Sequence, residues 1–356
     1  MVVPPRETWQ GTTRLREDAR RITSDAVGGD DDTCVIFAGS GATGAIDLWD
    51  FACGAPYVDI EMYPQCVGHP LAYKDAVFIS PHKFVGGPGT PGVLVAQKSL
   101  LHNRVPDVVG GGTVAYVNPT DHRYLDNPVH REEGGTPDII GSIRAGLVFQ
   151  LKAAVGVATI RLHEQTYCQR AIATWSANPA IQLLGNTRSD RLSILSFVVN
   201  RPNGCYLHHN FVVALLSDLF GIQSRGGCSC AGPYGHRLLG IDIERSHEFE
   251  HEITQGCEGI KPGWTRVSFN YFISDTVAKY LVDAVDLLAE HGWKLLPEYR
   301  FRSRNRIVAP SPWSHRTTPP AAAIVLRPRD RRTSWAAARP TAGRRVRPCR
   351  LPRHRP

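Results

Sequence analysis

The stretch Ser80–Gly92, SPHKFVGGPGTPG, places a lysine where an apolar strand gives way to a glycine-rich turn. The run before it, Asp75–Ser80 (DAVFIS), and the run after it, Gly92–Gln97 (GVLVAQ), are rich in β-branched and apolar residues, which predicts two strands. A lysine at a loop entrance is often only a solvated surface residue. The meaning of Lys83 therefore depends on which other side chains can act with it.

Composition and charge predict a globular chain with a separate tail. The 356 residues, 42% of them hydrophobic, are enough for a large domain and a smaller one. The net charge of +8 is concentrated in residues 303–356, which hold fourteen arginines and one acid, so residues 1–302 carry a net −5. We expect this Pro- and Arg-rich tail to be disordered. It lacks the interleaved aromatic residues of a stacking platform, which argues against a nucleic-acid partner.

The cysteines and the apolar runs indicate in which compartment of the cell the protein is expected. Nine cysteines are scattered without a repeating framework, and the segment Met1–Gln10 lacks the features of a secretory signal. No apolar run approaches the roughly 20 residues needed to cross a bilayer. The sequence therefore predicts a cytoplasmic protein with no membrane association.

The pattern of elements changes near residue 175. We expect a helix over Thr12–Ala26 that starts at Thr12 or Thr13, and one or two long helices between Pro137 and Trp175. Strands are expected over 34–38, 48–52, 191–199 and 265–272, and a helix over 208–221 closed by a glycine. This arrangement predicts an α/β domain over 1–175, an α+β domain over 176–302 and the tail over 303–356.

The segment Gly39–Gly44, GSGATG, fits the G-x-G-x-x-G pattern of dinucleotide sites. That pattern is informative only inside a βαβ unit with an acid at the end of the second strand. Here Asp59 follows a proline-containing stretch and no full-length helix intervenes, so a dinucleotide oxidoreductase is the weakest alternative. Backbone N–H groups and the Thr43 hydroxyl can still bind a phosphate.

A carboxylate also lies in an apolar segment. Asp50 stands in LWDFA, where burying an unpaired acid is costly, so it either caps a helix, pairs with a cation or serves a site. An acid at one strand end, a phosphate loop and a lysine at another strand end meet the needs of pyridoxal phosphate. This cofactor requires a lysine for its Schiff base, a carboxylate on its pyridine nitrogen and donors for its phosphate.

Four motifs together resemble the class V aminotransferases, the family that includes the cysteine desulfurases. They are DFACGAPYVDI (50–60), SPHKFVGGPGTPGVLV (80–95), REEGGTPDIIGSIRAGL (131–147) and QSRGGCSCAGPYGHRLLGID (223–242). The resemblance implies the pyridoxal-phosphate-dependent transferase fold of type I, with a large, mixed, doubly wound sheet domain and a smaller α+β C-terminal domain. It also implies pyridoxal 5′-phosphate as cofactor and a homodimer.

The resemblance assigns a role to individual residues around the cofactor. Lys83 resembles the Schiff-base lysine and Asp50 the carboxylate on the pyridine nitrogen. Thr136 resembles the threonine that is lent to the phosphate of the neighbouring subunit. The remaining cofactor contacts implied by the resemblance are Ala42, Thr43, Ser80 and His82.

Three further residues bear on the substrate. Arg266 and Arg225 resemble arginines that hold the carboxylate of an amino acid, a task suited to a bidentate guanidinium. Cys230 resembles the cysteine that takes sulfur from the substrate, which favours a cysteine desulfurase with a sulfur acceptor protein over an aminotransferase acting on another amino acid. The alternatives for Cys228 and Cys230 are a metal half-site, which lacks a second ligand pair, or plain structural thiols.

The sequence departs from the family pattern at two places. Only three residues separate Gly44 from Leu48, whereas a parallel crossover takes about a dozen or more. The resemblance thus implies an internal deletion near residues 47–48, together with an aberrant tail after Phe301 that is typical of a frame translated out of phase. The deletion would remove a histidine that stacks on the cofactor ring, and Cys53 stands where many desulfurases have a glutamine. A catalytically inactive, truncated remnant is therefore a second hypothesis.

Overall fold

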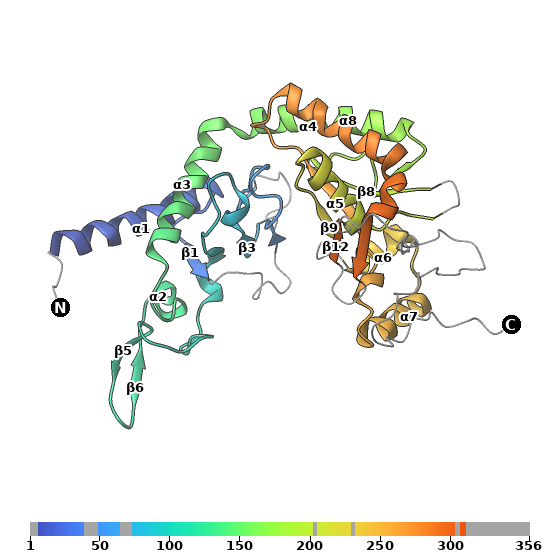
Figure 1. The fold of residues 1–356 in the computed structure, drawn as a ribbon. Coiled ribbons are helices and arrows are strands. Elements are labelled where there is room, and N and C mark those ends of the chain that lie inside the picture. The colour runs from blue at the N-terminus through green and yellow to red at the C-terminus, as the bar shows by residue number, and fades with distance from the viewer. Residues whose placement is uncertain are drawn as a thin grey trace. The chain divides into compact units, whose positions relative to one another are not determined.

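A computed structural model of the chain describes residues 6–38, 49–64, 73–201, 205–228, 232–302 and 307–310. These residues form two compact units, Met1–Leu162 and His163–Pro356 (Figure 1). The division falls inside a helix, and the domain boundary predicted after residue 175 lies further along that same helix. The loop 39–44, Cys230 and most of the tail are outside the described residues.

The first unit contains a mixed sheet of four strands in the order β1-β4-β3-β2. Its strands are β1 (Thr33–Ala38), β2 (Trp49–Asp50), β3 (Ala76–Ile79) and β4 (Gly92–Gln97). β4 pairs antiparallel with β1 and with β3, while β2 pairs parallel with β3. Strands β1, β2 and β3 therefore share one direction, and the carboxyl ends of β2 and β3 lie side by side.

The helices and turns of the first unit follow the apolar pattern closely, with one correction. They are α1 (Arg6–Ala26), α2 (Pro128–Glu132), α3 (Ile139–Val155), the start of α4 (Val157–Ala177), and the 3₁₀ turns η1 (Pro81–Lys83) and η2 (Lys98–Leu100). The expected start of the first helix at Thr12 or Thr13 is wrong, because α1 continues back to Arg6. The two threonines lie in the helix, where a residue that can cap is also tolerated.

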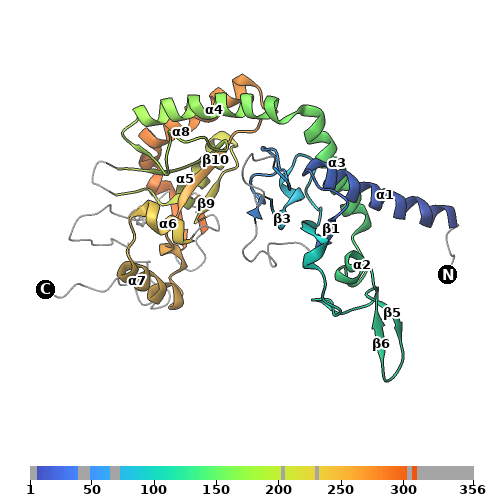
Figure 2. The same ribbon diagram turned by 180° about the vertical axis from the view of Figure 1, so that it is seen from behind.

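A hairpin of β5 (Val114–Val117) and β6 (His122–Tyr124), which the sequence did not predict, extends from the rest of the first unit (Figure 1; Figure 2). The core of this unit packs α1 and α3 against the sheet. The two helices touch where an added Cβ at Gly146 would lie 2.8 Å from the Cα of Ala19, so the crossing requires a glycine there.

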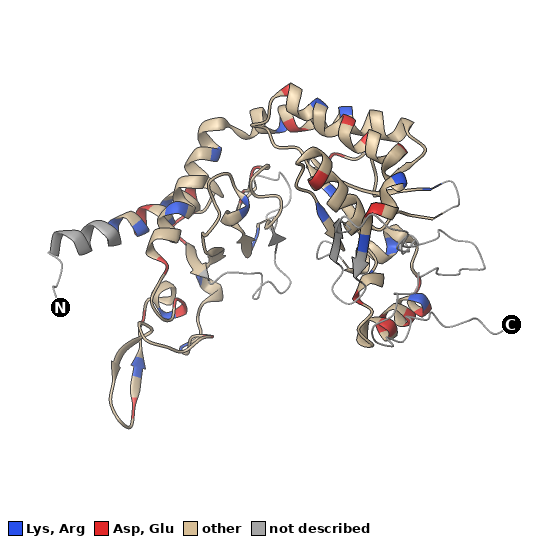
Figure 3. Cartoon of the chain, viewed as in Figure 1, with Lys and Arg blue, Asp and Glu red and all other residues tan. Residues whose placement is uncertain are grey.

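A buried ion cluster joins α1 to the segment that precedes α3. The Glu133 carboxylate, whose side chain is 5% exposed, accepts from Arg16, from Arg20 at 2.7 Å and from the backbone N–H of Phe37 at 2.7 Å. Burial raises the pKa of this carboxyl, but the hydrogen bond and charge of Arg20 outweigh it and hold the pKa below its usual range. Charges of both signs alternate along the described part of α1, as Figure 3 shows.

Helices α3 and α4 meet at a bend of 76°. Within the described residues no single helix is both long and apolar enough to cross a bilayer, although this bent pair would pass the same test together.

The second unit is an α+β arrangement. Its helices and turns are the rest of α4, α5 (His209–Phe220), α6 (Gly232–Leu239), α7 (Ile243–Thr254), η3 (Glu258–Ile260), α8 (Asp275–His291) and η4 (Gly292–Glu298). Its strands are β7 (Ile181–Leu183), β8 (Ile194–Val199), β9 (Arg225–Gly227), β10 (Trp264–Ser268), β11 (Tyr299–Arg302) and β12 (Ile307–Pro310). β12 lies within the predicted tail and pairs antiparallel with β11. α5 ends as expected, with Gly221 in the left-handed conformation.

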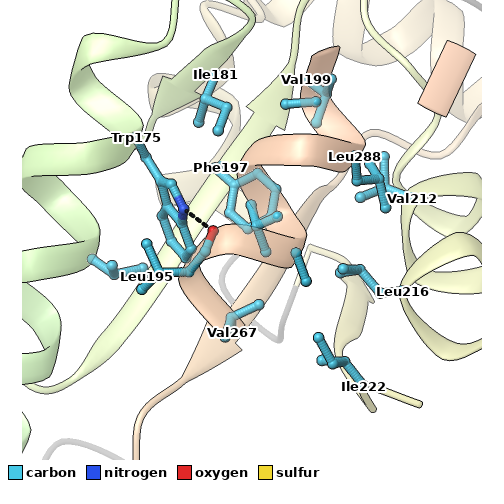
Figure 4. Packing of buried hydrophobic residues seen from close by; sticks show 14 of the residues in the cluster. Trp175, Ile181, Leu195, Phe197, Val199, Val212, Leu216, Ile222, Val267 and Leu288 are labelled. Atoms are coloured by element: carbon cyan, nitrogen blue, oxygen red, sulfur yellow. Dashed lines mark hydrogen bonds between the residues drawn. The ribbon is translucent and has the colours of Figure 1, made fainter. Parts of the chain in front are cut away.

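The main sheet of the second unit is antiparallel, in the order β7-β8-β10-β9, with a different layer on each face. One face packs against α4, α5 and α8 around Trp175 and Phe197, and the Trp175 indole donates to the Val282 carbonyl at 3.1 Å (Figure 4). On the other face Trp264 and Val198 pack against α6. Residues alternate between the faces along each strand, so the sheet separates the large core from the α6 side.

Glu164, on α4, is a buried acid that forms no ion pair among the described residues. Its carboxylate lies 2.7 Å from the Ser193 hydroxyl, which also donates to the Phe269 carbonyl at 2.6 Å, and it accepts from the Tyr271 N–H. A hydroxyl has one proton to give, so both contacts of Ser193 are satisfied when Glu164 is protonated and donates. Burial raises the pKa of Glu164 to about 7, while its contacts with the Ser193 hydroxyl and the Tyr271 N–H act in the opposite direction.

The substitution Glu164→Gln is expected to make stability less dependent on pH. The carboxyl binds its proton more tightly in the folded state, so the stability it contributes is present below pH 4.5 and is lost as pH rises through about 7. The wild-type chain should lose on the order of 3 kcal/mol across that window, and the glutamine variant should not. Urea unfolding at several pH values measures this, with Glu290→Gln at an exposed site as control. The prediction would be contradicted if the free energy of unfolding changed with pH in the same way in the wild type, Glu164→Gln and Glu290→Gln.

Candidate active site

Lys83 lies at the carboxyl end of β3, on the 3₁₀ turn η1. The β-branched residues of β3 end at Ile79, and Pro81 then opens the turn because its fixed φ angle suits a first helical position. The Lys83 backbone N–H donates to the Ser80 carbonyl at 3.0 Å, and the Lys83 side chain is exposed. The lysine amine thus lies at the edge of the sheet where β2 and β3 both end.

Ser80 and His82 lie just before this lysine and carry polar side chains that can bind a ligand. Ser80 occupies the position before η1 but its hydroxyl does not cap the turn. Within the described residues neither the Ser80 hydroxyl nor the His82 ring makes a hydrogen bond, and His82 is exposed. A hydroxyl and an imidazole beside a lysine amine form a donor set that suits an anion such as phosphate.

Asp50 ends β2 beside β3, at the same edge as Lys83. Its backbone pairs with that of Phe78, and the next residue, Phe51, donates its N–H to the Phe78 carbonyl at 3.0 Å. The orientation of the Asp50 side chain is outside what the structure describes. The parallel pairing of β2 and β3 is the reason that Asp50 and Lys83, far apart in sequence, reach one edge.

Helix α3 holds the turn that follows Asp50 through hydrogen bonds from Lys152. The Lys152 ammonium donates to the carbonyls of Ala55 and Val58. Burial lowers the pKa of Lys152 to about 8, while the charge of Asp59 acts in the opposite direction. Lys152 thereby holds the turn that carries Cys53.

Cys53 is in direct contact with the site lysine. The Lys83 amine donates to the Cys53 sulfur at 3.6 Å, and Cys53 is a free cysteine with an exposed side chain. Sequence reasoning noted Cys53 only as a departure from the family pattern. The contact depends on the β2–β3 pairing, which no local sequence signal specifies.

The glycine-rich loop after Lys83 folds back tightly on η1. A Cβ at Gly87 would lie 1.9 Å from the Pro81 carbonyl oxygen, so no side chain fits at this position. The loop is also tied to α3, because Arg144 donates to the Pro88 carbonyl at 2.8 Å. These contacts set the path of the chain around Lys83.

Thr136 lies in the exposed segment between α2 and α3. Its neighbour Gly135 donates its N–H to the Gly111 carbonyl at 2.7 Å, which connects this segment to the base of the β5–β6 hairpin. Thr136 therefore stands at the surface, next to the hairpin.

The second unit brings the two predicted arginines together. Arg225 on β9 and Arg266 on β10 are direct partners in the antiparallel ladder. Their side chains therefore leave the same face of the sheet, which is the face of Trp264 and α6. Two like charges directly opposite one another are unfavourable, and an anion between them would relieve this repulsion. Arg266 is half-buried and Arg225 is exposed.

Three predicted site residues, Ala42, Thr43 and Cys230, lie outside the described residues. Cys228, which precedes that gap, is a free and exposed thiol. Among the described residues no group of three His, Cys, Asp or Glu side chains is arranged to hold a metal ion.

Comparison with known proteins identifies the family of more than half of the chain. The family model Aminotransferase class-V matches residues 72–274. A cysteine desulfurase of Dickeya dadantii is 31% identical over 186 residues, which are 51% of this chain and 43% of the relative. The chain thus spans less than half the length of that curated relative.

Two solved structures share the fold. An apo cysteine desulfurase from Thermococcus onnurineus superposes with a TM-score of 0.59 at 19% identity, covering 79% of this chain and 85% of that chain. A mutant of C-DES with glycine covalently linked to its pyridoxal-phosphate cofactor superposes with a TM-score of 0.52 at 12% identity, covering 80% and 88%. Both likenesses agree with the type I fold of pyridoxal-phosphate enzymes. Because the family model covers more than half of the chain, and includes Lys83 with its glycine-rich loop and both arginine strands, this chain belongs to the class-V aminotransferase family.

Proposed function

We propose that this chain is a pyridoxal-phosphate-dependent enzyme that takes sulfur from cysteine. The observation that carries the proposal is the meeting of Lys83 and the Asp50 strand end at one edge of the sheet. The names of the curated relatives, which are cysteine desulfurases, favour this reaction over transamination of another amino acid.

The residues present fit the cofactor. Lys83 supplies an exposed amine, and Ser80 and His82 supply polar groups that make no other hydrogen bond within the described residues. We propose that Ala42, Thr43 and Thr136 complete the phosphate contacts and that the Asp50 carboxylate holds a proton on the pyridine nitrogen. When bound, pyridoxal phosphate supplies an electron-withdrawing ring that stabilises negative charge on the substrate carbon.

The chain's own groups then orient the substrate and move its protons. Lys83, when its amine is free, is the base that removes the proton from the substrate carbon and later returns a proton. Arg225 and Arg266 bind the carboxylate of the amino acid through bidentate hydrogen bonds. Cys230 is the proposed sulfur-accepting thiol, from which a sulfur acceptor protein would take the sulfur.

The arginine pair provides a direct test of the substrate. Arg266→Lys keeps the charge but loses the guanidinium fork, so the KM for cysteine should rise about tenfold or more, because a charge-assisted hydrogen bond contributes about 1.5–3 kcal/mol. Steady-state kinetics of alanine formation measure this, with Arg188→Lys, at an exposed site of the second unit, as control. An unchanged KM in both Arg266→Lys and Arg266→Ala would remove Arg266 from the substrate site.

We also propose that two copies pair through the hairpin side of the first unit. Large apolar side chains are exposed there, and exposed apolar surface that gathers in one region is typical of protein interfaces. They are Val108, Val109, Tyr116, Val117 and Ile140, all more than 60% exposed. The exposed Thr136 lies beside them, where a partner's phosphate would need it. Sedimentation of the purified protein as a monomer would count against this pairing.

An inactive remnant is the rival hypothesis. It is favoured by the short β2, which has only two residues and no further paired strand within the described part of the sheet. Alanine formation from cysteine by the purified, cofactor-loaded chain would exclude it.

A further inference from the structure

The contact between Lys83 and Cys53 is not needed for any role assigned above. The amine donates to the sulfur at 3.6 Å, and both side chains are exposed. The contact joins two separate elements, η1 after β3 and the turn after β2 that Lys152 holds in place. The pairing of β2 with β3 therefore brings the two residues together, although 30 positions separate them in the sequence.

The other free thiols differ from Cys53 in their surroundings. Cys34, Cys168 and Cys205 are buried, and burial raises the pKa of the Cys34 and Cys168 thiols, which disfavours the reactive thiolate. Cys228 is exposed, but within the described residues no lysine donates to it. Cys53 combines an exposed sulfur with a cationic donor, the setting in which cysteines act as nucleophiles.

We propose that Cys53 is itself a sulfur-accepting thiol, which takes sulfur directly from the amino-acid substrate while Lys83 receives its proton. This inference rests on the proposed function and adds a catalytic residue to it. The same lysine that exchanges protons with the substrate carbon is the one in contact with the thiol. Cys53 therefore lies next to the group that acts on the substrate.

The step balances without an external oxidant. The Cys53 thiolate attacks the sulfur of the substrate cysteine, so that an S–S bond forms and the carbon–sulfur bond of the substrate breaks. The electron pair of the broken bond stays with carbon, which is reduced and takes up a proton to give alanine. The substrate sulfur is oxidised to the persulfide level on Cys53. The thiol proton passes to Lys83, which can return it to carbon.

The first experiment locates the persulfide. The full chain, loaded with pyridoxal phosphate, is given cysteine without oxygen, alkylated and digested, and the extra sulfur is mapped by mass spectrometry. We expect the extra sulfur on the peptide that contains Cys53, its loss in Cys53→Ser, and its retention in the matched control Cys228→Ser. Alanine formation with the persulfide confined to Cys230 would overturn the inference and leave the proposed function intact. Absence of alanine would instead reject the proposed function.

The second experiment requires no turnover. The cofactor-free chain is treated with inorganic polysulfide, whose sulfane sulfur a thiolate takes by displacing a shorter polysulfide. Cys53 should be persulfidated about tenfold faster than Cys228, and Lys83→Met should abolish that difference, since a charge-assisted hydrogen bond to sulfur is removed. Equal rates at the two cysteines, or a difference that survives in Lys83→Met, would overturn the role of the pair.

Discussion

Replacement of Lys83 by alanine is expected to prevent covalent attachment of pyridoxal phosphate and to lower alanine formation from cysteine by at least about a hundredfold. The reason is that one positioned proton-transfer group contributes roughly 10²–10⁴-fold to a rate. In the proposed function Lys83 has that role and also binds the cofactor covalently, and its amine stands exposed at the end of β3. Borohydride reduction of the loaded wild-type chain should fix the cofactor on the peptide that contains Lys83.

Two further variants make this result specific. Lys83→Arg retains a positive charge but cannot form the covalent bond, so it should fail as Lys83→Ala does. Lys98→Met removes an exposed lysine of the same unit and should keep both the cofactor and the rate. Cofactor fixed by borohydride on another lysine, or turnover that persists in Lys83→Ala, would show that the site has been placed wrongly.

Glu133→Ala should lower the stability of the chain by about 3–5 kcal/mol, because it leaves buried cations without a partner. The Glu133 carboxylate is shared by Arg16 and Arg20 and also accepts from the Phe37 N–H. Its removal would free the segment that carries Thr136 from α1 and β1. Urea unfolding followed by circular dichroism measures the change in the free energy of unfolding.

Glu17→Ala is a matched control, because it removes an exposed carboxylate that contacts the same Arg20 three residues away. Such exposed pairs contribute only about 0.2–0.5 kcal/mol. The lowered pKa of Glu133 also sets the sign of the pH effect: its stabilisation is present above the unfolded value of 4.5 and is lost as pH falls through the folded value. Equal losses of stability in the two variants would rule out the clustered charge as the cause.

Much of the fold could be predicted because strong local signals specify it. The apolar, β-branched runs predicted β1, β3 and β4 to within a residue or two, and the glycine after α5 predicted its end. The strand around Asp50 is shorter than expected, because the chain turns after two paired residues. The exposed β5–β6 hairpin was missed because its strands lack the alternation of a half-buried sheet, with most of their side chains in solvent.

The site could be predicted only in part for a similar reason. The motif around Lys83 and the residue types at Arg225 and Arg266 are visible in the sequence, and the ladder between β9 and β10 confirms that the arginines are neighbours. The contacts of Cys53 and of Lys152 arise from strand pairing and helix packing between distant segments. A linear pattern carries no record of such pairings.

The contact at Gly87 limits how this site can change. A position that leaves 1.9 Å between a new Cβ and the Pro81 carbonyl oxygen accepts no side chain without displacing the turn on which Lys83 sits. In a saturation library, position 87 should tolerate glycine alone, whereas Gly111, which has open space around it, should tolerate many residues. The position of the Lys83 amine thus depends on the lack of a side chain at Gly87. Laboratory evolution of this loop would have to change positions other than 87.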